Sequence, residues 1–204
     1  MSEASTGPGR ARDLDRLLTF VDAVIAIAMT LLVLPLVELT SKVTAQDSVA
    51  EVIGEHQPVI WSFVLSFAVI SRFWFAQHYS LRHVLVPHGR LSALLMLWTL
   101  TIVFLPFPTA LVARAGDQAM TKVLYIGTMI LSTLILALMD LVVIRNRRLT
   151  DGLGLPAVEP AVTNAALLSL ALVMALAVPG ASYFPLLLLF LDAPIRKALA
   201  GLRR

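Results

Sequence analysis

Five ionisable side chains lie inside long apolar stretches of this 204-residue sequence, where a charge at the centre of a bilayer costs about 2.5–3.5 kcal/mol. They are Asp22, Arg72, His78, Asp140 and Asp192. Side chains of this kind either pair on neighbouring helices or line a path for ions or protons. Two interpretations are therefore open for Asp22, Arg72 and His78, namely a neutralising network between helices and direct participation in ion or proton passage.

Asp22 needs a partner outside its own helix. Arg16 lies six residues before it, about 9 Å along a helix and on a different face. We therefore expect each of the two side chains to find its partner on another helix. Asp140 and Asp192 lie five and four residues before an arginine, so for these two the sequence predicts snorkelling and local pairing at the membrane face.

The stretch that follows Asp22 carries an apolar stripe. Ile27, Leu31 and Leu34 have the i, i+4, i+7 spacing of one helical face, and Thr30 lies beside them. Such a stripe is normally a packing surface within a helix bundle. If copies of this helix surrounded an axis, however, the stripe would form apolar rings of the kind that gate or select by dewetting, with a ring of threonine hydroxyls beside them.

The composition is that of a membrane protein. Hydrophobic residues make up 58% of the chain and charged residues 14%, whereas soluble domains average about 25% charged residues. The formal net charge is only +3, and the basic residues separate apolar runs instead of forming a stripe, which argues against nucleic-acid binding. The sequence contains no nucleotide-binding loop, nucleophile elbow or metal-ligand spacing and no cysteine. We therefore expect neither an enzyme nor a bound cofactor or metal.

Six apolar segments are long enough to be transmembrane helices. They cover residues 17–39, 59–79, 91–112, 123–144, 162–178 and 183–199. Backbone groups in lipid must bond within their own segment, so the predicted fold is an all-α bundle of six transmembrane helices. It occupies one membrane domain, residues 14–200, between a polar segment 1–13 that is predicted to be disordered and a basic tail 201–204.

Basic residues predict the orientation of the bundle. Only Lys42, Arg114 and Lys122 lie on the side of the acidic first loop, and the other Lys and Arg residues gather at the N-terminus, the second and fourth connections and the C-terminus. Because cytoplasmic loops are enriched in Lys and Arg, we expect a multi-pass protein with both termini in the cytoplasm.

Three segments resemble one family. "RLLTFVDAVIAIAMTLLVLPL" (16–36) is similar to the Arg-x-x-x-Phe-Ser-Asp signature that opens the first helix of endosomal and lysosomal potassium channels of the transmembrane protein 175 type. "FWFAQHYSLRHV" (73–84) resembles the Trp and His-His stretch that ends their second helix, and "FLPFPTALV" (104–112) resembles the Pro-Phe-Pro-Thr segment of the third. The six predicted spans match the prokaryotic members.

The resemblance implies a potassium-selective leak channel in a prokaryotic plasma membrane, formed as a homotetramer with the first helix of each subunit lining a central pore. Potassium would be the permeating ion, and the partners would be further copies of the chain and the bilayer. The family's constriction and selectivity positions correspond to Ile27, Thr30, Leu31 and Leu34. The family's intracellular network, which holds the first helix in place, corresponds to Arg16, Phe20, Asp22, Trp74 and His78. We expect Arg72 to join this network as an ionisable residue of the same second span.

Two residues depart from the family pattern. Val21 replaces the signature serine, and Gln77 stands where the first of two histidines is usual. Both changes concern the intracellular network and not the constriction. A second function stays open beside the channel, namely a proton pathway or proton-coupled transporter that uses Asp22 and His78 as relay groups.

Overall fold

Helices form all regular elements of the described part of the chain. The computed structural model describes residues 8–41, 48–85, 88–115, 118–150, 155–177 and 186. The elements are α1 (Pro8–Leu31), α2 (Leu34–Thr40), α3 (Val49–Glu55), α4 (Gln57–Leu81), α5 (Gly89–Phe104), α6 (Pro106–Ala115), α7 (Ala119–Arg145), the 3-10 turn η1 (Arg147–Leu149) and α8 (Glu159–Ala177). The all-α prediction is confirmed.

Five stretches of the described residues are long and apolar enough to cross a membrane. They are Arg12–Thr40, Gln57–Leu81, Gly89–Ala115, Ala119–Arg145 and Glu159–Ala177. They coincide with the first five predicted spans and extend past them at most ends. The sixth predicted span, 183–199, and the tail 201–204 lie outside the described residues, apart from Leu186.

The first span is broken, which the sequence analysis did not predict. α1 ends at Leu31 and α2 begins at Leu34. Pro35 explains the break, because it has no N–H to donate and its ring clashes with the carbonyl four residues earlier. A tighter turn joins the two helices, in which the backbone N–H of Val33 donates to Thr30 at 3.2 Å and that of Leu36 donates to Val33 at 2.9 Å.

The third span is divided in the same way, between α5 and α6 at Pro106. A cluster of buried hydroxyls fixes α6 after this break. Ser66 of α4 lies 2.8 Å from the Thr109 hydroxyl and 2.6 Å from the Tyr125 hydroxyl of α7. Three helices are therefore joined by hydrogen bonds where the proline interrupts the ladder.

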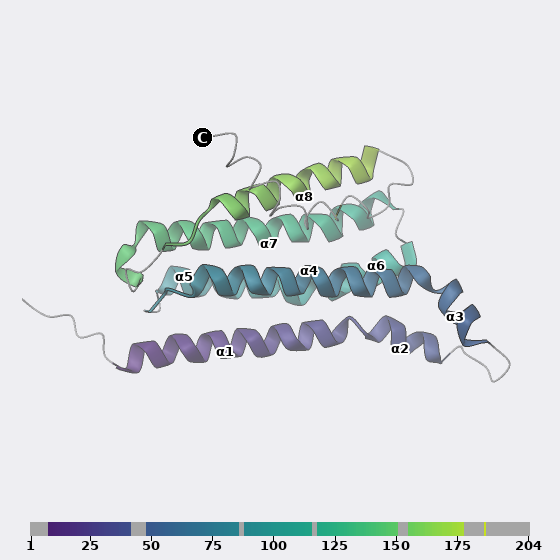
Figure 1. The fold of residues 1–204 in the computed structure, drawn as a ribbon, viewed down its shortest axis with the longest axis horizontal. Coiled ribbons are helices and arrows are strands. Elements are labelled where there is room, and N and C mark those ends of the chain that lie inside the picture. The colour runs from purple at the N-terminus through teal and green to yellow at the C-terminus, as the bar shows by residue number, and fades with distance from the viewer. Residues whose placement is uncertain are drawn as a thin grey trace, which may run out of the picture.

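The helices lie roughly antiparallel, with α1 at one side of the bundle and α8 at the other (Figure 1). α7 packs against α8, α5 and α6, whereas α1 packs mainly on α5. The core between them holds large buried side chains such as Trp98, Ile102, Met129 and Leu168. Because α1 is an outer element of the described bundle, the described helices cover only one of its faces.

One end of the bundle collects the basic connections. The start of α1, the link from α4 to α5 and the link from α7 to α8 all lie at that end (Figure 1). The two links are tied together, since the backbone N–H of Leu85 donates to Leu149 at 2.8 Å and Val84 forms a bridge with Thr150. The described basic residues on which the predicted orientation rests are thus gathered at one end of the bundle.

The N-terminal segment needs a correction. Residues 1–13 were predicted to be disordered, but α1 begins at Pro8, so residues 8–13 are helical. Proline is favoured at the first position of a helix, where its missing N–H is not needed. The polar composition of the segment concealed this helix start.

Candidate functional site

The two faces of α1 differ in burial. Val21, Ile25, Ala28 and Leu32 are buried against the bundle. The predicted stripe occupies the uncovered face, where Ile27 is 59% exposed, Leu31 40% and Leu34 51%. The three side chains are therefore exposed on a part of α1 and α2 that the described helices leave open.

Thr30 is exposed beside this stripe and has a fixed orientation. Its hydroxyl donates to the carbonyl oxygen of Ile27 at 2.7 Å. A threonine hydroxyl has one hydrogen and two lone pairs. Because the hydrogen is directed at the helix backbone, the oxygen can offer only lone pairs to a partner outside the helix. A cation suits this arrangement, whereas an anion would lack a donor.

Asp22 is held by the neighbouring helix, as expected from its position. The indole Nε1 of Trp74 in α4 donates to Asp22 Oδ1 at 2.8 Å. The Trp74 ring contacts His78, with ring centroids 5.8 Å apart. A small hollow of about 370 Å³ lies beside this pair, lined by Asp22, Ile25, Ala26, Met29, Ser71, Trp74 and Phe75. The structure thus brings together three of the predicted network residues, from α1 and α4.

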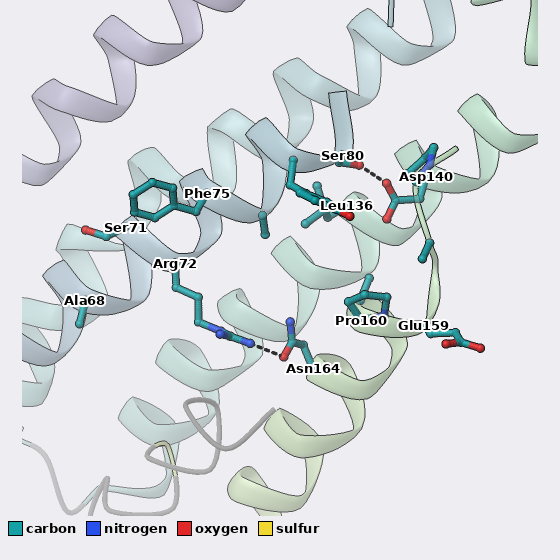
Figure 2. Close-up of a pocket in the computed structure, with 15 residues that line it drawn as sticks. Ala68, Ser71, Arg72, Phe75, Ser80, Leu136, Asp140, Glu159, Pro160 and Asn164 are labelled. Atoms are coloured by element: carbon teal, nitrogen blue, oxygen red, sulfur yellow. Dashed lines mark hydrogen bonds between the residues drawn. The ribbon is translucent and has the colours of Figure 1, made fainter. Parts of the chain in front are cut away.

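The other predicted network residues lie elsewhere. Arg16 and Phe20 are exposed on α1, and Arg16 makes no hydrogen bond or ion pair with any described residue. Arg72 donates through Nη2 to Asn164 Oδ1 of α8 at 2.8 Å (Figure 2). Arg72 is therefore bonded on the α8 side of α4, and a network that joins it to Asp22 and His78 stays a prediction.

Asp140 also differs from its prediction. Its side chain is 4% exposed and accepts a hydrogen bond from the Ser80 hydroxyl of α4 (Figure 2). It is therefore buried between helices and does not snorkel towards Arg145. Burial without a hydrogen-bond partner costs a carboxylate several kcal/mol, which explains the bond to Ser80. Asp192 lies outside the described residues.

Sequence reasoning missed both polar partners, Asn164 and Ser80. The available signal was that each is a polar residue inside an apolar run. Lys122 is a third buried polar residue that sequence reasoning missed, since it is 5% exposed and donates to the carbonyl of Ala175 at 3.1 Å. This carbonyl lies near the C-terminal end of α8, where a cation is favoured. Among the described residues, no three His, Cys, Asp or Glu side chains are grouped so that they could hold a metal ion.

Comparison with known proteins finds a matching family model and a matching solved structure. The family model of the endosomal/lysosomal potassium channel TMEM175 matches residues 16–106, which include the exposed stripe, Asp22 and Trp74. None of the curated proteins compared with the chain matches it.

A solved structure has the same fold. It is the crystal structure of a lysosomal potassium-selective channel TMEM175 homolog from Chamaesiphon minutus, which is 21% identical. The match has a TM-score of 0.71 and covers 89% of this chain and 97% of the homolog. The family and the homolog are ion channels and not enzymes. The family model covers somewhat less than half of the chain and the homolog shares its fold, so the chain is similar to the endosomal/lysosomal potassium channel TMEM175 family.

Proposed function

We propose that this chain is one subunit of a homotetrameric, potassium-selective leak channel in a prokaryotic plasma membrane, with α1 of each subunit lining a central pore. The observation that carries the proposal is the face of α1 and the start of α2 that the described helices leave uncovered, where Ile27, Leu31 and Leu34 are exposed. An apolar row in an outer helix can face lipid, but the family is one of channels. Four such rows around an axis would form stacked apolar rings.

Apolar rings of this kind act on the hydration of the ion. A narrow hydrophobic constriction is readily dewetted and admits an ion only when part of its water shell is lost. The sequence has no Thr-Val-Gly-Tyr-Gly loop to replace that water with carbonyl oxygens. Potassium gives up water more easily than sodium, so the rings would favour potassium to a modest degree, and potassium would pass without a resident cofactor.

The basic end of the bundle supports an orientation. Arg16, Arg82, Arg90 and Arg145 lie at the end where α1 starts and α4 and α7 finish. The positive-inside rule favours the cytoplasmic side for this end. We therefore propose that the N-terminus is cytoplasmic and that α2 lies near the outer mouth of the pore. The C-terminus would also be cytoplasmic if residues 183–199 cross the membrane.

The Thr30 hydroxyl is expected to contribute to selectivity, because its lone pairs are directed away from the helix backbone. Thr30→Val keeps the shape and removes the acceptor, so the potassium-to-sodium permeability ratio should fall by about two- to tenfold, the equivalent of one neutral hydrogen bond. Thr30→Ser keeps the hydroxyl and should keep the ratio. Reversal potentials under bi-ionic conditions in planar bilayers measure both, and an unchanged ratio in the valine variant contradicts this role.

A proton pathway is the second candidate, because Asp22 and His78 both contact Trp74. The same bilayer recordings separate the two functions. In a channel that selects potassium, the reversal potential follows the potassium gradient and ignores a pH gradient of one unit. In a proton pathway it follows the pH gradient, and removal of His78 abolishes the current.

A further inference from the structure

A polar groove lies beside α4, and among its lining residues only Ser71 and Phe75 also border the hollow next to Asp22. It has a volume of about 740 Å³ and runs between α4, α7 and the start of α8 (Figure 2). Its polar side chains are Ser71, Arg72, Tyr79, Ser80, Asp140, Glu159 and Asn164. Because α1 and α8 are at opposite sides of the bundle (Figure 1), this groove is not part of the face proposed to line the pore.

Charges of both signs lie in the groove at similar depth. Asp140 is five residues from the end of α7, and Asn164 is five residues from the start of α8, so both are about 7.5 Å inside the helix ends. The bond to Asn164 holds the Arg72 guanidinium at this level. Glu159 is exposed at the first position of α8, one and a half turns nearer to the surface.

The remaining walls are apolar and mostly small. Ala68, Ala76, Pro156, Pro160 and Ala161 line the groove. Phe75 and Tyr79 are exposed at its border, at 64% and 56%. A groove of this size, with small apolar walls between charges of both signs, has room for the start of an acyl chain beside a polar headgroup.

We propose that this groove binds a phosphatidylethanolamine molecule from the surrounding bilayer. The phosphate is held by Arg72, since guanidinium is the side chain best suited to phosphate oxygens. The ammonium donates to the carboxylates of Glu159 and Asp140. Basic pockets between transmembrane helices bind anionic headgroups, whereas this groove carries both signs of charge and so matches a zwitterionic headgroup.

The pairing of charges excludes the other common headgroups as equal ligands. Phosphatidylcholine carries a quaternary ammonium without N–H donors, so it cannot form hydrogen bonds to the two carboxylates. Phosphatidylglycerol carries no cation and places its phosphate near Glu159 and Asp140 without compensation. The groove therefore distinguishes phosphatidylethanolamine from phosphatidylcholine by the N–H donors of its ammonium, and from phosphatidylglycerol by the presence of that cation.

Native mass spectrometry of the full-length, delipidated protein tests whether the groove prefers phosphatidylethanolamine. The probes are phosphatidylethanolamine, phosphatidylcholine and phosphatidylglycerol with identical acyl chains, added at equal ratio in detergent. The protein should retain phosphatidylethanolamine about tenfold better than phosphatidylcholine, as expected for one charge-assisted hydrogen bond. Equal retention of the two lipids by the unmodified protein overturns the proposal.

Variants assign the contacts. Glu159→Gln, at an exposed position, and the double variant with Asp140→Asn should bring phosphatidylethanolamine down to the level of phosphatidylcholine and leave phosphatidylcholine unchanged. Arg72→Gln should weaken retention of both. The matched control is Arg82→Gln, an exposed arginine near the same helix end that does not line the groove, and it should change nothing.

Two further outcomes overturn the proposal. One is a Glu159→Gln protein that keeps the full preference for phosphatidylethanolamine. The other is displacement of the lipid by millimolar phosphoethanolamine, because a headgroup without acyl chains then suffices and the groove is a site for a soluble ligand.

Discussion

Ile27→Ala should raise the single-channel conductance and bring the potassium-to-sodium permeability ratio close to one. Ile27 is the most exposed of the three stripe residues on α1, at 59%, and lies above the anchored Asp22 by little more than one turn. In a tetramer, four alanines in place of four isoleucines widen the ring by several carbon atoms on each side. Ions then pass without losing water, so the difference between potassium and sodium disappears.

Leu131→Ala is the matched control for this change. Leu131 lies on α7, is 50% exposed and is equally apolar, but it is not on α1. Bi-ionic reversal potentials and single-channel currents should be the same for this variant as for the unmodified protein. If Ile27→Ala and Leu131→Ala behave alike, Ile27 is not at the constriction.

Removal of the contact between α1 and α4 should lower the potassium flux strongly. Trp74 Nε1 donates to Asp22 Oδ1 at 2.8 Å, and this is the one hydrogen bond between the side chains of α1 and α4 in the described part of the chain. A hydrogen bond to a charged group contributes about 1.5–3 kcal/mol, which corresponds to a shift of about tenfold or more in the equilibrium between anchored and released α1.

The experiment is a double-mutant cycle in which potassium efflux from potassium-loaded liposomes is measured. Asp22→Ala and Trp74→Phe should each reduce the flux by about tenfold, and the double variant should be little worse than either, because the two side chains act through one contact. Trp61→Phe, in an exposed position of the same helix, is the control and should leave the flux unchanged.

Size-exclusion profiles separate loss of function from loss of assembly in this cycle. All four proteins should elute as the same oligomer. Additive effects of Asp22→Ala and Trp74→Phe would contradict a shared contact, since independent sites add.

The helical architecture could be predicted from the sequence because it depends on local features. Apolar length defines a transmembrane span, and five of the six predicted spans appear as helices in the described residues. The stripe on α1 could be found for the same reason, since Ile27, Leu31 and Leu34 share a face by their spacing alone. What spacing could not tell was which face the bundle covers.

Contacts between distant residues could not be predicted in this way. Arg72 and Asn164 are 92 positions apart, and Ser80 and Asp140 are 60 apart. The hydrogen-bond partner of Arg72 can be assigned only when the packing of α4 against α7 and α8 is known. The break after Leu31 was detectable, because Pro35 occupies the span and a proline interrupts the ladder four residues earlier.

The central claim, that the uncovered face of α1 lines the ion pathway, can be tested through the absence of cysteine from the chain. Single cysteines at Ile27, Leu31 and Leu34, and at Leu131 as the control, place one thiol at each site in an otherwise unreactive protein. Potassium flux in liposomes is then recorded while micromolar silver ions are added, because silver binds thiolates and has the size and charge of a permeating cation. We expect irreversible block for Ile27→Cys, Leu31→Cys and Leu34→Cys, and none for Leu131→Cys. Undiminished flux through the three α1 variants, or equal block of Leu131→Cys, would contradict a pore lined by α1.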